Sequence, residues 1–321
     1  TGKIETSDKL LNRFIENVRW SMLCNFISIP TDCPQRNERM GWAGDTHVFC
    51  RTATYEADTR LFYLRYLDDF RDLQEEDGRL PNIAPIGGGF GGITYESAMI
   101  IMVWELYQQY GDIGIVREYY DSMKKWMAYI RGCKMPGDSF VGPLGDWLAT
   151  EETDNHLIWN AFYGYDCRLM RIFSSLLGKD EDARCFKALE DEAKAYWNEN
   201  FVDSATGKTK NLKGQIVDTQ CSYALPLVYG MFNDENKDKA FENLARKTQE
   251  LGCTIGTGFF GTGVLNRALT DAGRIDLAYR LLLQTDFPSW LYPVTQGATT
   301  IWERWDSYTV EKGFGGNNSM N

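Results

Sequence analysis

Two stretches, far apart in the chain, place carboxyl groups beside arginine and tryptophan side chains. The first, DCPQRNERMGWAGD, spans residues 32–45 and contains Asp32, Arg36, Glu38, Arg39, Trp42 and Asp45. The second, QGATTIWERWDSY at residues 296–308, places Glu303 between Trp302 and Arg304. An indole ring desolvates a neighbouring carboxyl group and raises its pKa, whereas a nearby arginine lowers it. Carboxyl groups in such surroundings suit proton transfer.

A third stretch of this kind, GPLGDWLATEETDN at residues 142–155, places Asp146 beside Trp147. Glycoside hydrolysis needs one carboxyl group as an acid on the glycosidic oxygen and another as a base or nucleophile on the opposite face. Tryptophan offers apolar faces to sugar C–H groups, and arginine and aspartate offer charged hydrogen-bond partners to hydroxyl groups. Three such stretches therefore favour a glycoside hydrolase.

A purely structural interpretation of the first stretch stays open. We expect a helix to begin near Gly44 and Asp45 and to continue to Phe70, so Asp45 could cap that helix. The acidic side chains could also pair with Arg36 or Arg39 in a salt-bridge network, and such networks are common outside active sites.

The composition restricts the partners. The chain has 321 residues and a net charge of −11, so it repels polyphosphates, and we predict no nucleic-acid partner. It has no run of 18 apolar residues, so we predict no membrane span. The first residues show no basic-then-apolar export signal, which leaves a cytoplasmic and an exported location open. Aromatic residues reach 14%, which suits a sugar-binding cleft or a large aromatic core.

The cysteine and histidine content argues against a metal site and against a nucleophile activated by histidine. The eight cysteines form no C-x-x-C pair and only two histidines are present, so we predict no metal site. The cysteines lie mostly in apolar helical surroundings, which indicates reduced, buried thiols. A nucleophile activated by histidine has almost no candidate partner.

The rest of the chain reads as repeated helical hairpins, each with one helix that is apolar nearly all round and one with a single apolar face. The predicted pairs are 97–112 with 113–132, 156–178 with 180–201, 219–232 with 233–252, and 261–273 with 274–286. Such hairpins stack as an open solenoid or close into a ring. We predict a single all-α domain over residues 1–321.

Long loops join successive hairpins at 73–93, 134–155, 202–216 and 286–300. Loops gathered at one end of a helical ring would build a cleft there. The segment GGGFGG at 87–92 fits G-x-G-x-x-G but follows no predicted strand, so it favours a mobile loop beside the cleft over a dinucleotide site.

Several motifs together resemble the catalytic domain of bacterial α-L-rhamnosidases, glycoside hydrolase family 78. They are DCPQRNERMGWAGD, GDWLA, TGFFGT, LTDAGRIDLAYRLLLQTDFPSW and QGATTIWERWDSY, and they run from residue 32 to about 321. The resemblance implies an (α/α)₆ barrel and an inverting hydrolase that releases terminal α-L-rhamnose from glycosides, oligosaccharides or polysaccharides. Two carboxyl groups suffice for that reaction, so we predict no metal and no organic cofactor.

The resemblance also implies roles for single residues. Glu38 occupies the position of the general acid, and Glu303 that of the general base. The expected substrate-binding residues are Asp32, Arg36, Trp42, Asp45, Tyr95, Glu96, Asp146, Trp147, Trp290 and Trp302. An inverting geometry predicts that the two catalytic carboxyl groups lie roughly 6.5–9.5 Å apart, which leaves room for a water molecule.

The chain departs from the family pattern in two ways. Tyr95 and Glu96 stand where the family commonly has tryptophan and aspartate. The substrate preference on the side of the site that these two residues form is therefore open. We also expect the barrel to be incomplete at the C-terminus, with a twelfth helix and the flanking β-sandwich domains outside residues 1–321. The alternatives are an (α/α)₆ enzyme for another sugar, a lyase included, and a carbohydrate-binding protein without catalysis.

Overall fold

The computed structural model describes residues 2–133 and 143–316, and helices dominate these residues. The helices are α1 (Lys9–Asn25), α2 (Ala43–Glu56), α3 (Arg60–Asp72), α4 (Ile93–Glu96), α5 (Ala98–Tyr110), α6 (Ile113–Cys133), α7 (Asn155–Leu176), α8 (Asp180–Phe201), α9 (Gln220–Tyr229), α10 (Asp234–Glu250), α11 (Phe259–Asp271), α12 (Ile275–Leu282) and α13 (Tyr292–Thr295). One small antiparallel hairpin joins β1 (Tyr308–Thr309) to β2 (Gly313–Phe314). The predicted all-α class is confirmed.

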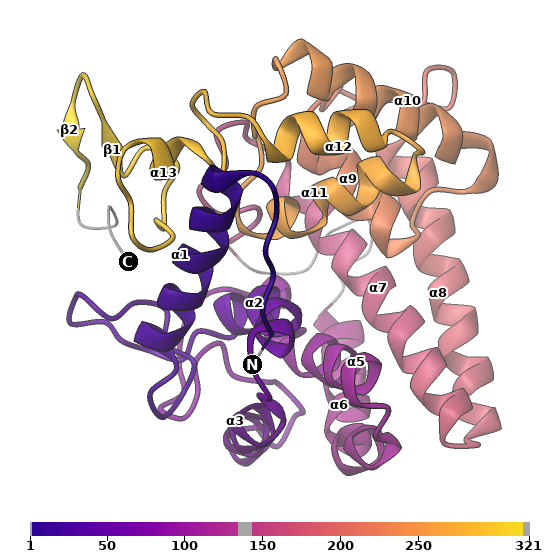
Figure 1. Ribbon diagram of the computed structural model, residues 1–321. Helices are drawn as coiled ribbons and strands as arrows, with labels where there is room; N and C mark the ends of the chain where they lie inside the picture. Colours follow the sequence, from indigo (N-terminus) through magenta and orange to yellow (C-terminus); the bar gives the residue numbers. More distant parts are fainter. Residues whose placement is uncertain (1, 134–142, 317–321) are drawn as a thin grey trace.

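The predicted hairpins are present as helix pairs: α5 with α6, α7 with α8, α9 with α10, and α11 with α12 (Figure 1). Helix α7 is buried over most of its surface, and every residue of α9 is buried. Helix α8 buries one stripe, which includes Phe186, Leu189 and Trp197, and leaves its other faces polar. This difference between apolar and amphipathic helices separates an inner layer from an outer one.

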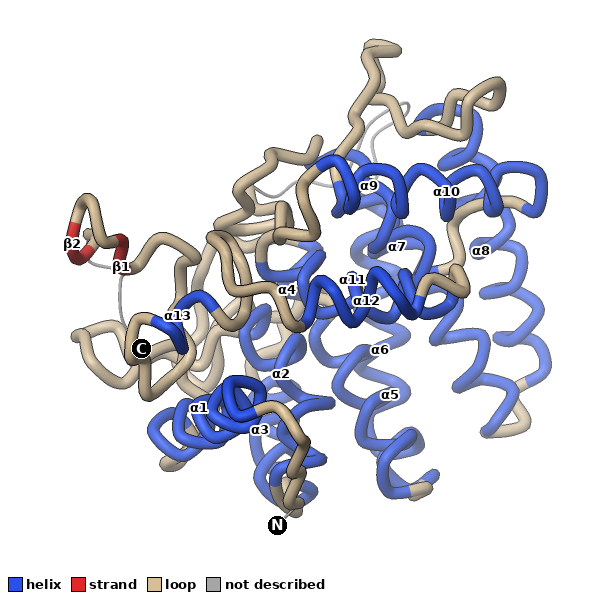
Figure 2. The backbone as a smooth tube through the Cα atoms, turned by 45° about the horizontal axis from the view of Figure 1, so that its top comes forward, coloured by secondary structure: helices blue, strands red, loops and turns tan. Residues whose placement is uncertain are grey.

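The inner layer of the described residues runs through α2, α5, α7, α9 and α11, with consecutive members in contact. Between α11 and α2, an apolar groove reaches to the side of α1 and is lined by Phe14, Val18, Phe49 and Phe259. Figure 2 shows that most of the long loops gather on the side that carries α4, α13 and the β1–β2 hairpin. The helical hairpin barrel therefore collects its loops on the side where the acidic stretches of residues 32–45 and 296–308 are found.

One predicted helix is wrong in its extent. The sequence predicts a single helix from about residue 44 to Phe70, but the structure breaks it into α2 and α3. Ala57, between them, has an extended backbone with φ −151° and ψ 165°. The backbone N–H of Thr59 donates to the hydroxyl of Tyr110 at the end of α5, 3.1 Å away. A tertiary hydrogen bond thus stabilises a break that the apolar spacing does not reveal.

Two expectations from composition can be compared with the structure. All eight cysteines are free thiols, in agreement with the prediction that they are reduced. Among the described residues, no helix combines the length and the apolar character that crossing a membrane requires.

Candidate active site

The first acidic stretch folds into a loop that leads into α2. The backbone N–H of Asp32 donates to the carbonyl oxygen of Met40 at 2.9 Å, and the N–H of Met40 donates to Oδ1 of Asp32 at 2.7 Å. These reciprocal bonds hold the two ends of the loop together. Arg39 turns the chain with φ 50°, in the left-handed region. The side chains of Arg36 and Glu38 project from the closed loop.

The guanidinium of Arg36 binds three carboxylates. Its Nη2 lies 3.1 Å from Oδ2 of Asp32, its Nε lies 2.9 Å from Oε2 of Glu38, and its Nη1 lies 2.7 Å from Oε2 of Glu303. The guanidinium is planar and rigid, so the directions of these bonds are fixed relative to one another. Arg36 therefore brings together the two acidic stretches that lie more than 260 residues apart in sequence.

The two glutamates differ in exposure. The side chain of Glu38 is 33% exposed, whereas that of Glu303 is 9% exposed. The indole N–H of Trp42 donates to Oε1 of Glu38 at 2.7 Å and fixes that carboxyl group from a second side. Burial raises the pKa of Glu303, and the hydrogen bond and charge of Arg36 oppose the rise. One carboxyl group thus faces the open side of the site while the other lies deeper.

The segment that carries Glu303 is irregular but is anchored on both sides of that residue. The backbone N–H of Ile301 donates to Oγ of Ser21 on α1 at 2.7 Å. The indole N–H of Trp305 donates to the carbonyl oxygen of Thr257, just before α11, at 2.9 Å. Helices at both sides of the apolar groove therefore position the predicted base.

Asp45 lies in the first turn of α2 but does not cap it, because the helix begins after Trp42 without a side-chain cap. Its side chain is partly buried and lines the main cleft. Burial, reinforced by the negative charges of Asp32, Glu303 and Glu38, raises the pKa of Asp45 to about 8. Asp45 is therefore mostly protonated at neutral pH and presents a hydroxyl donor to the site.

Tyr95 forms a buried wall behind Trp42. Its ring packs edge-to-face against Trp42 and against Phe260, with centroids 5.6 and 5.9 Å apart. The chain passes so close to this ring at Gly44 and Gly91 that a Cβ atom at either position would meet ring atoms at 2.5 and 2.2 Å. Burial raises the pKa of Tyr95, so its hydroxyl stays protonated.

Glu96 and Asp146 bind protein groups and do not line the main cleft. Glu96 is buried and accepts from Arg79 at 3.2 Å and from the side-chain amide of Asn82 at 3.1 Å. Asp146 is partly buried and accepts from the backbone N–H groups of Gly258 at 2.7 Å and of Phe260 and Gly261 at 2.8 Å. Asp146 thus satisfies N–H groups at the beginning of α11, which have no partner within the helix.

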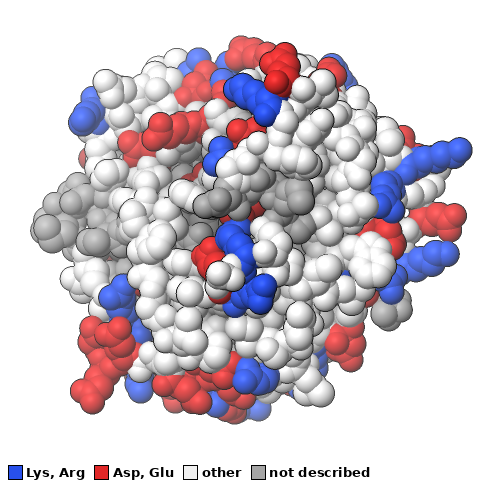
Figure 3. All heavy atoms as spheres, turned by 90° about the vertical axis from the view of Figure 1, so that its left-hand side faces the viewer, with Lys and Arg blue, Asp and Glu red and all other residues white. Residues whose placement is uncertain are grey.

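The main cleft has a volume of about 550 Å³ and includes the apolar groove. Six of the predicted site residues line it: Asp32, Asp45, Trp147, Trp290, Trp302 and Glu303. Arg36 and Glu38 lie beside the cleft, because Arg36 bonds both Glu303 and Glu38. Trp305 also lines it and was not among the predicted residues, although its place in the motif WERWD was a signal. Figure 3 shows a hollow in this face with a small group of acidic and basic side chains at its centre.

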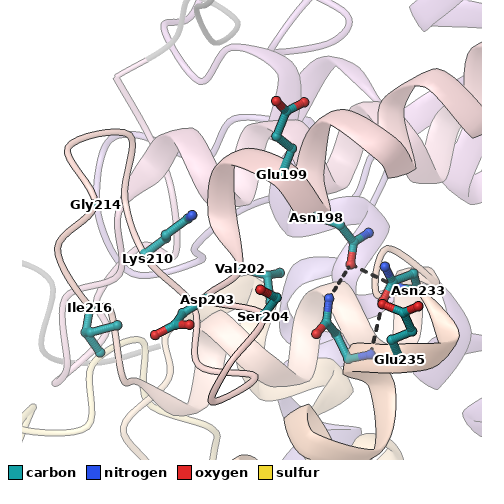
Figure 4. Close-up of a pocket in the computed structure, with 11 residues that line it drawn as sticks. Asn198, Glu199, Val202, Asp203, Ser204, Lys210, Gly214, Ile216, Asn233 and Glu235 are labelled. Atoms are coloured by element: carbon teal, nitrogen blue, oxygen red, sulfur yellow. Dashed lines mark hydrogen bonds between the residues drawn. The ribbon is translucent and has the colours of Figure 1, made fainter.

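A second surface pocket, of about 570 Å³, lies where α8 ends and α10 begins. Asn198 organises it, because its Oδ1 accepts from the backbone N–H of Asn233 at 3.0 Å. Figure 4 shows Glu199, Lys210 and Glu235 pointing in different directions around this pocket. Its charged groups therefore do not converge on one centre as those of the main cleft do.

Ligand atoms of Asp32, Cys33 and Glu38 lie within 4.8 Å of one another, a spacing that a metal ion could use. The guanidinium of Arg36 already binds both carboxylates. Burial raises the pKa of Cys33 to about 11, so its sulfur is a neutral thiol, a poor metal ligand. The donor set therefore fits the cation of Arg36 better than a metal ion.

Comparisons with known proteins identify the family of this chain. Residues 1–321 match the family model described as the bacterial alpha-L-rhamnosidase 6 hairpin glycosidase domain. The chain is 36% identical to an alpha-L-rhamnosidase of Formosa agariphila and 36% identical to one of Streptomyces avermitilis, each over 98% of this chain. It covers 34% and 30% of those relatives, so it spans about a third of their length.

Solved structures give the same result. The crystal structure of the Streptomyces avermitilis alpha-L-rhamnosidase complexed with L-rhamnose matches 99% of this chain with a TM-score of 0.91 and 35% identity, over 30% of that protein. The alpha-L-rhamnosidase from Aspergillus terreus matches all of the chain with a TM-score of 0.90 and 32% identity, over 38% of that protein. The chain belongs to the family of bacterial alpha-L-rhamnosidase six-hairpin glycosidase domains.

Proposed function

We propose that the protein containing this chain hydrolyses terminal α-L-rhamnosyl residues by an inverting mechanism. The observation that carries the proposal is the convergence of Glu38 and Glu303 on the guanidinium of Arg36 at the edge of a tryptophan-lined cleft. Relatives that are named alpha-L-rhamnosidases support the choice of sugar.

Glu38 is the general acid in this proposal, and it donates its proton to the glycosidic oxygen as the bond to the anomeric carbon breaks. Its larger exposure suits the side of the leaving group, and Trp42 holds the carboxyl group in place. Glu303 is the general base, and it accepts a proton from the water molecule that attacks the anomeric carbon from the opposite face. The separation of about 6.5–9.5 Å between the two carboxyl groups stays a prediction.

The remaining residues of the site bind the sugar in this proposal. Asp32, Arg36 and protonated Asp45 offer hydrogen-bond partners to hydroxyl groups. Trp42, Trp147, Trp290 and Trp302 offer apolar surfaces, and the buried Tyr95 supports Trp42 from behind. Glu96 and Asp146 act indirectly, because their carboxyl oxygens are engaged by Asn82 and by the beginning of α11.

Activity against a panel of 4-nitrophenyl glycosides tests the proposal. We expect release of nitrophenol from the α-L-rhamnopyranoside and much slower release from glucosides, galactosides and mannosides. Faster turnover of another sugar would favour a different (α/α)₆ glycosidase. Binding of L-rhamnose without turnover of any glycoside would favour the carbohydrate-binding protein.

A further inference from the structure

The segment 86–92 places one exposed aromatic side chain, Phe90, beside the candidate active site. Its sequence is IGGGFGG, so no polar side chain occurs in it. Phe90 is 59% exposed and Ile86 is 65% exposed.

Phe90 is linked to the proposed general acid through one residue. Its ring packs edge-to-face on Trp42, with centroids 5.3 Å apart and an interplanar angle of 74°. The indole N–H of Trp42 donates to Glu38 at 2.7 Å. The exposed phenyl ring therefore lies on the side of the site where Glu38 lies, while the cleft tryptophans Trp147 and Trp290 come from other segments.

The segment is held in this place by Asn82. The backbone N–H of Gly92 donates to Oδ1 of Asn82 at 2.9 Å, and the N–H of Asn82 donates to the carbonyl oxygen of Gly88 at 3.3 Å. Gly89, with φ 100°, lies so close that a Cβ atom there would meet Cβ of Asn82 at 2.5 Å. Glu96 fixes Asn82 in turn. These contacts oppose the free movement that the glycine content predicts, and they present Phe90 on a positioned backbone.

The proposed reaction indicates which part of the substrate lies against Phe90. A general acid lies within hydrogen-bond reach of the glycosidic oxygen, and the leaving group begins at the next atom. A second sugar in that place would need partners for its hydroxyl groups, which the side chains of IGGGFGG do not supply. A planar aromatic group needs only an apolar face or edge, which Phe90 supplies, whereas a sugar stacked on this ring through its C–H groups would still need polar partners for its hydroxyl groups.

We propose, on the basis of the function proposed above, that Phe90 forms part of the leaving-group subsite and that this subsite takes an aromatic aglycone rather than a second sugar. Asn82 and Glu96 are positioning residues for the subsite, because their polar groups hold the segment from behind.

The test compares the parent protein with Phe90→Ala on three substrates: 2-naphthyl α-L-rhamnopyranoside, methyl α-L-rhamnopyranoside and a disaccharide with terminal α-L-rhamnose. We expect kcat/KM for the naphthyl substrate to fall about tenfold, chiefly through KM, because one aromatic contact is lost. We expect changes below about twofold for the methyl and disaccharide substrates and for inhibition by L-rhamnose.

Two controls separate recognition from folding. Phe90→Tyr keeps the ring and should retain the parent preference for the naphthyl substrate. Tyr279→Ala removes an aromatic side chain that is 60% exposed on α12. This substitution should leave kcat/KM unchanged for all three substrates.

Three results would overturn the inference. Equal losses on the naphthyl and methyl substrates would show that Phe90 acts through Trp42 and Glu38. An unchanged kcat/KM for the naphthyl substrate in Phe90→Ala would show that the ring does not contact the aglycone. A parent protein that hydrolyses no rhamnoside would overturn the proposed function and this inference with it, whereas the first two results leave the proposed function intact.

Discussion

Arg36 on the loop before α2 and Glu303 on the loop after α13 are joined by a hydrogen-bonded ion pair, with Nη1 2.7 Å from Oε2. The same guanidinium binds Glu38 through Nε. The relative position of the proposed acid and base therefore depends on a side chain between them as well as on the helices that carry their loops. The positive charge of Arg36 also opposes the rise in the pKa of Glu303 that burial causes.

Arg36→Gln should move the acid limb of the pH profile of kcat/KM to higher pH. Arg36 lowers the pKa of Glu303, so its removal lets burial raise that pKa further, and the base then becomes ionised only at higher pH. The measurement is kcat/KM for an aryl rhamnoside between pH 4 and pH 9. Arg39→Gln removes an equal charge from an exposed neighbour and should leave the limb in place. An unchanged limb in Arg36→Gln would contradict this electrostatic role.

Asp146→Ala should destabilise the fold. The substitution leaves the buried N–H groups of Gly258, Phe260 and Gly261 without their partner, and each such loss costs on the order of 1 kcal/mol or more. We expect the free energy of unfolding in urea to fall by about 2–4 kcal/mol. Asp180→Ala, at the exposed beginning of α8, should cost less than about 1 kcal/mol. Equal effects of the two substitutions would contradict the contacts of Asp146.

Asp166 on α7 gives a pH dependence of stability that is independent of catalysis. It is fully buried, accepts from the hydroxyl of Ser97 at 2.6 Å, and burial raises its pKa to about 8. Between about pH 4 and pH 8 the folded protein holds a proton there that the unfolded chain releases, so this contribution to stability is lost as the pH rises.

Urea unfolding at pH 5 and pH 8 tests this linkage. The parent should lose more stability over that interval than Asp166→Asn, by on the order of 2 kcal/mol, since the amide carries no ionisable proton. Asp182→Asn is the control, because Lys124 lowers the pKa of Asp182 and its titration lies below this interval. Identical pH dependence in the parent and Asp166→Asn would contradict the assignment.

The stereochemistry of the product tests the arrangement of the two carboxyl groups. If Glu303 activates water on the face opposite Glu38, the first sugar released from an α-L-rhamnoside is β-L-rhamnose. Proton NMR of the anomeric signals in the first minutes of the reaction distinguishes this product from the α anomer. Initial release of α-L-rhamnose would point to a covalent intermediate and to a much closer pair of carboxyl groups.

The helical hairpins could be predicted because their signal is local. The stripe of Phe186, Leu189, Ala193 and Trp197 on α8 is buried as its spacing predicts. The break between α2 and α3 could not be predicted, because neither glycine nor proline marks Ala57 and the bond that stabilises it comes from Tyr110.

The positions of the site residues could be predicted only in part. The first acidic stretch and Glu303 do converge, and Arg36 mediates this convergence. Glu96 and Asp146 resemble substrate ligands in sequence, yet their partners come from tertiary contacts, and for Asp146 these lie more than 110 residues further along the chain. Phe90 gave only the weak signal of an apolar residue among glycines, and its relation to Glu38 depends on how Trp42 packs.

The most direct test of the proposed chemistry is the turnover of 4-nitrophenyl α-L-rhamnopyranoside by the parent protein and by Glu303→Gln, with binding of L-rhamnose measured by calorimetry on both. We predict that the parent releases nitrophenol, that kcat in Glu303→Gln falls by about 10²–10⁴-fold, and that the dissociation constant for L-rhamnose changes much less. Hydrolysis by Glu303→Gln at the rate of the parent would contradict the assignment of Glu303 as the general base.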